Sequence, residues 1–192
     1  MSALRSKMND RPRGGVLGWF VIAAAVALAV VVVSMAVRVP ADVAAAPLFR
    51  PPPSTAGTDL VGKQVALGSM QGAPLVVIFF ASWCGPCHED APIFAALADR
   101  YRERVGFISV AVDDAPHEAR AFASRYGWTW PVVRDEERRW VAAFGPPGVP
   151  ATFVVDAKGA VIRTLTGPVT EEQIDAALSP LVSSNDMVDP TG

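Results

Sequence analysis

The sequence predicts an α/β fold in which helices flank a central β-sheet. Residues 75–81 (LVVIFFA) form an apolar run that is too short for a helix and rich in β-forming residues, as in a strand buried on both faces. Residues 84–104 repeat apolar side chains at the spacing of an amphipathic helix. Strand and helix patterns keep alternating up to residue 182, and their order predicts a mostly parallel sheet with one antiparallel hairpin.

The first elements follow from apolar runs and their boundaries. Residues 63–67 (KQVAL) are expected to form a short edge strand before the central strand at 75–81. The helix over 84–104 contains Pro92, where we expect a kink, because proline removes a backbone donor. Residues 105–112 are apolar again and predict a second buried strand.

Proline and glycine mark the boundaries of the elements in the middle of the domain. A helix is expected over 116–126, with Pro116 in its first turn and Gly127 as its stop signal. Residues 131–135 predict a short strand, and a short helix is expected over 138–144.

The last elements are a hairpin and a capped helix. Strands are expected at 152–156 and 161–166, and Lys158-Gly159 suits the tight turn between them. Thr170 is the expected N-cap of the last helix, and Gln173 lies three residues later, as in a capping box.

A long apolar segment precedes this domain. Residues 16–37 carry no charge, and as a helix they would reach about 33 Å, enough to cross the hydrocarbon core of a bilayer. Residues 1–15 carry a net charge of +3, so the positive-inside rule places them in the cytoplasm. We therefore expect a cell-membrane protein with a single transmembrane anchor and an extracytoplasmic domain.

The alternative is a cleaved signal peptide. Ala44–Ala46 offers small residues for a peptidase, but the apolar segment is longer than the 7–15 residues usual in signal peptides. We prefer the uncleaved anchor, and both interpretations place the folded domain outside the cytoplasm.

The predicted organisation has five parts. After the cytoplasmic N-terminus and the anchor, a Pro-rich stretch has the composition of an extended linker. A domain of common size follows, and the polar end of the sequence predicts a flexible tail. The boundaries are residues 1–15, 16–37, 38–58, 59–182 and 183–192.

Composition excludes several classes of protein. With 51% hydrophobic and 19% charged residues, the chain is too apolar to be disordered. The net charge is −2, and without residues 1–15 it falls to −5, so the domain has no basic excess for binding nucleic acid. Two cysteines in 192 residues exclude a disulfide-rich scaffold.

The motif that carries chemistry is Cys84-Gly85-Pro86-Cys87, between the central strand and the helix. Unpaired backbone N–H groups and the positive end of the helix dipole stabilise a thiolate at the first cysteine. Cys84 is therefore expected to attack a partner's disulfide, and Cys87, one turn later, to resolve the mixed disulfide. Pro86 presets the helical φ angle at the start of the helix.

Three other uses of this motif are less well supported. A permanent structural disulfide would close only a four-residue ring and so stabilise little. The motif with His88 also fits C-x-x-C-H, the pattern of c-type haem attachment, but it follows an apolar β-run rather than a helical haem pocket. A zinc site lacks ligands, because only His88 and the distant His117 accompany the cysteines. We expect no metal and no cofactor beyond the redox-active cysteine pair.

The segments FFASWCGPCHEDAP, VAVDD and GVPATFVVD resemble membrane-anchored proteins of the TlpA/ResA/CcmG (DsbE) family. The resemblance spans about residues 60–180 and implies a thioredoxin-like fold with a mixed central sheet. It also implies thiol–disulfide exchange outside the cytoplasm, with Cys84 as the nucleophile and Cys87 as the resolving cysteine.

The resemblance assigns further residues around the pair. Pro150 matches the cis-proline that faces the cysteines, and Val149 before it would offer its backbone to an extended substrate. The contact surface beside Cys84 is expected to include Trp83, Gly85 and Pro86.

Asp90 matches an acidic position that ResA-like members fill with Glu. A partly buried carboxyl there would accept a proton from Cys87, its pKa raised by desolvation. The equal alternative is a solvated acid on the helix surface. General thioredoxins carry a buried Asp on the preceding strand, where this chain has Ile78, so that proton route is absent.

The expected function is an extracytoplasmic thiol:disulfide oxidoreductase, preferably a reductase of specific protein disulfides such as those of apocytochrome c. The resemblance implies a membrane electron donor of the DsbD/CcdA type as a partner. One alternative is an oxidase of exported proteins. Another is a thiol peroxidase, disfavoured because such enzymes place Thr where this chain has Ala81. A non-enzymatic binding module is disfavoured by the intact Cys84 and Cys87.

Overall fold

The computed structural model describes residues 22, 26 and 48–185. The chain divides into two compact units, Met1–Asp42 and Val43–Gly192, and the second contains the sheet. The expected anchor at 16–37 lies outside the described residues apart from residues 22 and 26. Among the helices that are described, none is long and apolar enough to cross a membrane.

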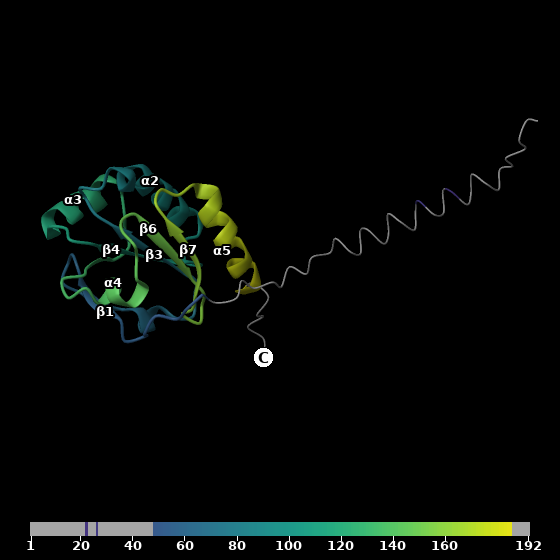
Figure 1. Cartoon of the computed structure of the whole chain (residues 1–192), viewed down its shortest axis with the longest axis horizontal. Helices are drawn as coiled ribbons and strands as arrows, with labels where there is room; N and C mark the ends of the chain where they lie inside the picture. The colour runs from purple at the N-terminus through teal and green to yellow at the C-terminus, as the bar shows by residue number, and fades with distance from the viewer. Residues whose placement is uncertain (1–21, 23–25, 27–47, 186–192) are drawn as a thin grey trace, which may run out of the picture. The chain divides into compact units, whose positions relative to one another are not determined.

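A single sheet forms the middle of the domain (Figure 1). Within the described residues it has seven strands in the order β2-β1-β5-β4-β3-β6-β7. The central strand β3 is buried along its whole length, as its unbroken apolar sequence predicts. The strands are β1 (Ala56–Asp59), β2 (Gln64–Ala66), β3 (Leu75–Phe80), β4 (Gly106–Ala111), β5 (Val132–Arg134), β6 (Ala151–Val155) and β7 (Val161–Thr166).

The sheet is mixed, as the resemblance implied, whereas the mostly parallel sheet expected from the element order is wrong. Only the β3–β4 and β4–β5 pairs are parallel among the six pairings of the described strands. Strand β6 returns antiparallel beside β3, and β1 is antiparallel to β5. Element order does not distinguish these pairings, because a long connection allows the next strand to enter in either direction.

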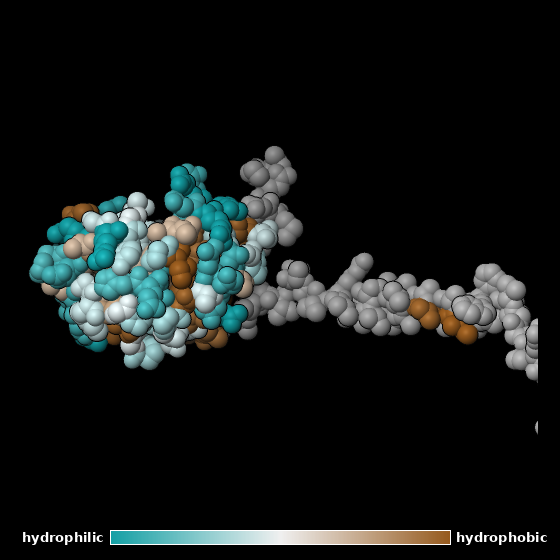
Figure 2. All heavy atoms as spheres, turned by 90° about the horizontal axis from the view of Figure 1, so that it is seen from above, coloured by the Kyte–Doolittle hydropathy of each residue, from teal (hydrophilic) through white to brown (hydrophobic). Residues whose placement is uncertain are grey.

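Helices cover both faces of the sheet (Figure 1). One face packs against α2 (Gly85–Arg100), α3 (Pro116–Arg125) and α5 (Glu171–Asn185), and its core includes Cys84 and Cys87. The other face packs against the short α4 (Arg139–Phe144). The face of the domain seen in Figure 2 is mainly hydrophilic, and hydrophobic residues appear on it in small patches.

The segment before β3 departs from the expected organisation. Residues 56–58, assigned above to the linker, belong to β1 and pair with β2. Gly57 makes this strand possible, because a Cβ there would lie 2.5 Å from Val133 Cγ1. Upstream, Phe49 forms an isolated bridge with Val161 and packs edge-on against Phe153. The folded domain therefore begins before residue 59.

Local signals at the C-terminal end are confirmed. Gly159 adopts a φ of 81° in the β6–β7 turn, a conformation that glycine adopts without strain. The Thr170 N–H donates to Gln173 Oε1 at 2.9 Å and the Gln173 N–H to Thr170 Oγ1 at 3.4 Å, which is the expected capping box. Helix α5 continues to Asn185, so residues 183–185 of the expected tail are helical.

Candidate active site

Cys84 and Cys87 form a disulfide at the N-terminus of α2. Cys84 is the N-cap residue, and its Cα lies 5.3 Å from that of Cys87. Both cysteines are buried, whereas Gly85 and Pro86 between them are exposed. The two sulfurs are therefore largely shielded from solvent, although the turn between the cysteines is accessible.

The helix N-terminus supplies the electrostatic environment of the pair. The Cys87 N–H points at Cys84 Sγ across 3.3 Å, and Pro86 lacks an N–H that would otherwise need a partner. In the reduced protein the same N–H and the helix dipole favour the thiolate at this position. The arrangement is that of a reactive dithiol rather than of a structural crosslink, which would stabilise little in so short a ring.

The peptide bond between Val149 and Pro150 is cis, as the resemblance implied. The Gly167 N–H donates to the Pro150 carbonyl at 2.9 Å and ties this turn to the end of β7. Val149 is half-buried and packs against the core clusters of both sheet faces. The turn is thereby fixed at the start of β6.

A groove of about 210 Å³ lies between this turn and the segment that carries the cysteines. Trp83 is 64% exposed, and its Nε1–H donates to the Asp113 carbonyl at 3.2 Å, which holds the indole at the groove. Asp113 in turn accepts two hydrogen bonds from Arg138, at 2.8 and 3.1 Å. Val112, Val141, Pro146, Pro147, Gly148 and Val149 complete the lining.

Asp90 is buried on α2, one turn after Cys87. Its side chain is 2% exposed, so the alternative of a solvated surface acid is excluded. Oδ1 accepts the Val169 N–H at 3.1 Å, and Oδ2 has no hydrogen-bond partner among the described residues. Burial raises the pKa of Asp90 to about 6, against the lowering effect of the Val169 hydrogen bond.

Two residues next to the site were given no role in thiol–disulfide exchange by the sequence analysis, which weighed His88 only as a haem or zinc ligand. The Asp114 carboxylate accepts the Ser82 N–H at 2.6 Å and the Ser82 hydroxyl at 2.7 Å. His88 lies within 2.8 Å of the Ser82 carbonyl through Nε2 and of the Tyr126 hydroxyl through Nδ1. Each ring nitrogen of His88 thus has a hydrogen-bond partner within the domain. Only the VAVDD segment hinted at Asp114, because acids that follow a buried strand lie at the sheet edge.

Comparison with known proteins identifies the family. The model described as Redoxin matches residues 42–178. The chain belongs to the Redoxin family. It is 29% identical over 127 residues to the thiol-disulfide oxidoreductase ResA of Bacillus thuringiensis (strain Al Hakam), covering 66% of this chain and 73% of that relative. It is 31% identical over 118 residues to ResA of Geobacillus thermodenitrificans, covering 61% and 68%.

Solved structures agree with this assignment. A thiol:disulfide interchange protein of the thioredoxin family from Chlorobium tepidum has a TM-score of 0.63 at 26% identity, covering 70% of this chain and 97% of that one. DsbF of MTB has a TM-score of 0.63 at 25% identity, covering 67% and 96%. This Redoxin-family member therefore has the thioredoxin-like fold and is a thiol-disulfide oxidoreductase of the TlpA/ResA/CcmG kind.

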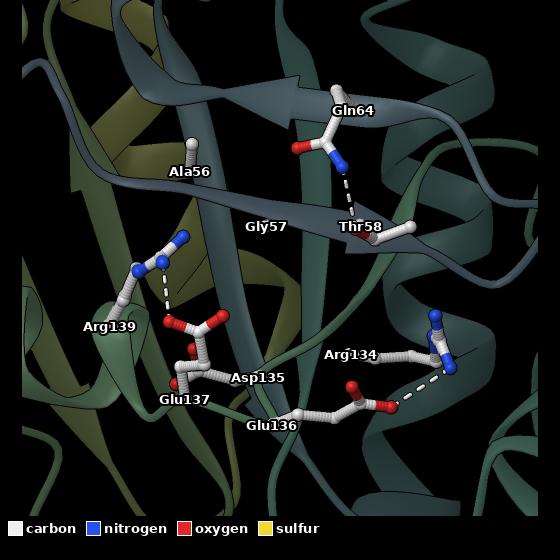
Figure 3. Close-up of a pocket in the computed structure, with 9 residues that line it drawn as sticks. All are labelled: Ala56, Gly57, Thr58, Gln64, Arg134, Asp135, Glu136, Glu137 and Arg139. Atoms are coloured by element: carbon white, nitrogen blue, oxygen red, sulfur yellow. Dashed lines mark hydrogen bonds and ion pairs between the residues drawn. The ribbon is translucent and has the colours of Figure 1, made fainter.

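A second, polar pocket of about 120 Å³ lies away from the cysteines, between β1, β5 and the start of α4 (Figure 3). Its charged side chains pair with one another: Arg139 with Glu137, and Arg134 with Glu136 at 2.9 Å. Asp135 accepts the backbone N–H groups of Trp140 and Val141 at the start of α4. Nothing in this pocket resembles a second reactive centre, and residues 48–185 contain no group of three His, Cys, Asp or Glu side chains placed to hold a metal ion.

Proposed function

We propose that this protein is a membrane-anchored reductase of specific protein disulfides, working outside the cytoplasm. The observation that supports the exchange chemistry is the buried carboxyl of Asp90, one turn after Cys87 on α2, whose pKa is raised to about 6. At neutral pH it is mostly ionised and able to accept a proton. A dithiol that reduces a substrate needs such an acceptor, because its second cysteine must lose a proton before it attacks.

The proposed reaction has two exchange steps. The Cys84 thiolate attacks one sulfur of the substrate disulfide, forms a mixed disulfide and releases the other sulfur as a thiolate. Cys87, deprotonated toward Asp90, then attacks Cys84 Sγ, so that the Cys84–Cys87 disulfide forms and the second substrate thiolate leaves. Two electrons pass to the substrate, and the two released thiolates take up protons.

The substrate is proposed to bind as an extended segment across the groove. Val149 and Pro150 would present a short backbone edge for pairing, as in β-strand addition. Trp83, Gly85 and Pro86 would contact the residues that flank the target cysteine. Apocytochrome c, whose haem-binding cysteines lie on an unfolded segment, is a substrate of suitable form. Recharging would require a membrane electron donor of the DsbD/CcdA type.

The location follows from sequence evidence. The uncharged stretch at 16–37 is long enough to span a bilayer, and the basic excess at 1–15 favours a cytoplasmic N-terminus. A phosphatase reporter joined after residue 192 should be active, since that enzyme requires export. An inactive phosphatase in a fusion protein of full length would refute this topology.

The deciding experiment measures the reduction potential of the full chain in detergent, by equilibration with glutathione and dithiothreitol. A value near about −270 mV, as in thioredoxin, would support a reductase. A value near about −120 mV would instead favour the oxidase. Reduced protein should then be mixed with an oxidised apocytochrome c peptide, with Cys84→Ser protein as the control.

A further inference from the structure

All three polar groups of Ser82 are held, two residues before Cys84. Its N–H and hydroxyl both donate to the Asp114 carboxylate, at 2.6 and 2.7 Å. Its carbonyl lies 2.8 Å from His88 Nε2. The turn that contains Ser82 is closed by the Cys84 N–H, which donates to the Ala81 carbonyl at 3.2 Å. The segment that presents Cys84 is therefore fixed from both sides.

The hydrogen bonds assign the tautomer of His88. A carbonyl oxygen only accepts, so Nε2 must carry the proton that it donates to Ser82. In the neutral ring Nδ1 then accepts from the Tyr126 hydroxyl at 2.8 Å. The imidazole also lies against Phe122, with 4.7 Å between the ring centroids. His88 thus joins the cysteine turn to helix α3.

We propose that His88 is a positioning residue for thiol–disulfide exchange. Its hydrogen bond to the Ser82 carbonyl holds the turn so that Cys84 stays at the N-terminus of α2, where the thiolate is stabilised. Tyr126 fixes the imidazole in the donating orientation. His88 follows Cys87 directly, but its two ring nitrogens contact Tyr126 and Ser82 rather than a sulfur, so it acts through the backbone of Ser82.

The alternative is that His88 merely fills space between α2 and α3. The two explanations make different predictions for substitutions of His88 by side chains of similar size. Leucine would pack against Phe122 but lacks a donor for Ser82. Glutamine keeps an N–H donor at similar reach. Since leucine and glutamine are both uncharged, the comparison between them isolates the hydrogen bond.

The test measures the rate at which the reduced full chain reacts with 5,5′-dithiobis(2-nitrobenzoate), below the unfolding temperature of every variant. His88→Leu should slow the reaction about fivefold, the effect of one net hydrogen bond, and His88→Gln should restore it to within about twofold. Tyr126→Phe should slow the reaction less than His88→Leu does. The imidazole of His88 then keeps its packing and its hydrogen bond to Ser82, and loses only the Tyr126 hydroxyl that orients it.

His117→Leu is the matched control. His117 is the other histidine of the chain, is exposed on α3 and contacts Glu118, so its loss should leave the rate unchanged. Equal rates in wild-type and folded His88→Leu protein would overturn the proposal. So would equal slowing in His88→Leu and His88→Gln, because the hydrogen bond would then not be responsible.

Discussion

The two faces of the sheet differ in what they bury. The face under α2, α3 and α5 contains both cysteines in its core, next to the buried carboxyl of Asp90 on α2. The opposite face contains an aromatic cluster in which Phe153 packs edge to face against Phe79 and Phe144, and the rings of Phe79 and Phe144 are tilted against each other. Redox chemistry therefore occupies one face, while the other supplies apolar packing. Substitutions on the two faces should separate activity from stability.

The largest effect is expected from Cys84→Ser. A serine hydroxyl does not form a mixed disulfide, so exchange should fall on the order of 1000-fold or more. Turnover of a disulfide substrate measures this loss, and circular dichroism should show an unchanged fold. Cys87→Ser should instead trap a mixed disulfide through Cys84. Residual exchange near the wild-type rate in Cys84→Ser would contradict the assignment of the nucleophile.

Phe153→Ala should produce the largest loss of stability. The side chain is 1% exposed and contacts the rings of Phe79 and Phe144 at 5.5 and 5.2 Å between centroids. The cavity should lower the free energy of unfolding by about 3–5 kcal/mol. Urea unfolding measures this change. The exchange rate of the folded variant should stay within about twofold of wild type, and a much slower rate would show that the two faces are coupled.

Asp90→Asn should make the protein more stable, in a pH-dependent way. The pKa of Asp90 is 3.8 in the unfolded chain and about 6 in the folded protein. The protonated carboxyl therefore leaves the folded state fully stable below pH 3.8, and this stability is lost as the pH rises through 6, because the ionised carboxyl is desolvated. The loss approaches about 3 kcal/mol above pH 7.

Asparagine still accepts the Val169 N–H, so it should recover most of that loss at pH 8 and little at pH 4. Unfolding of the oxidised protein at both pH values measures the difference, and equal effects would show that the carboxyl is not desolvated. The exchange rate of Asp90→Asn should also lose a step near pH 6 in its pH profile. An unchanged profile would remove Asp90 from the mechanism.

Phe49→Ala should have the smallest effect of the four. Phe49 is 36% exposed and touches the aromatic cluster at its edge, with 6.2 Å to the ring centroid of Phe153. We expect a loss of about 1 kcal/mol in the free energy of unfolding, the usual worth of such aromatic pairs. Leu48→Ala, at a neighbouring and more exposed position, is the control. If both variants unfold like wild type, the residues before β1 add no stability to the aromatic face.

Strong local signals made most of the fold predictable. The apolar run of β3, the capping box of α5 and the hairpin of β6 and β7 each depend on residues close in sequence. Strand β1 was missed because Ala-Gly-Thr-Asp has a single β-forming residue, Thr58, and no apolar alternation. It is a strand because β2 and β5 supply partners on both sides.

The amino-acid sequence by itself determined the reactive centre. A cysteine pair at the start of a helix acquires its chemistry from backbone groups within one turn, so no distant contact is needed. The cis bond before Pro150 was correctly expected from the resemblance. Only the tertiary structure decided the surroundings of the pair. The burial of Asp90 beside Val169 and the contacts of Ser82 with Asp114 depend on segments 79 and 32 residues apart, which local patterns do not encode.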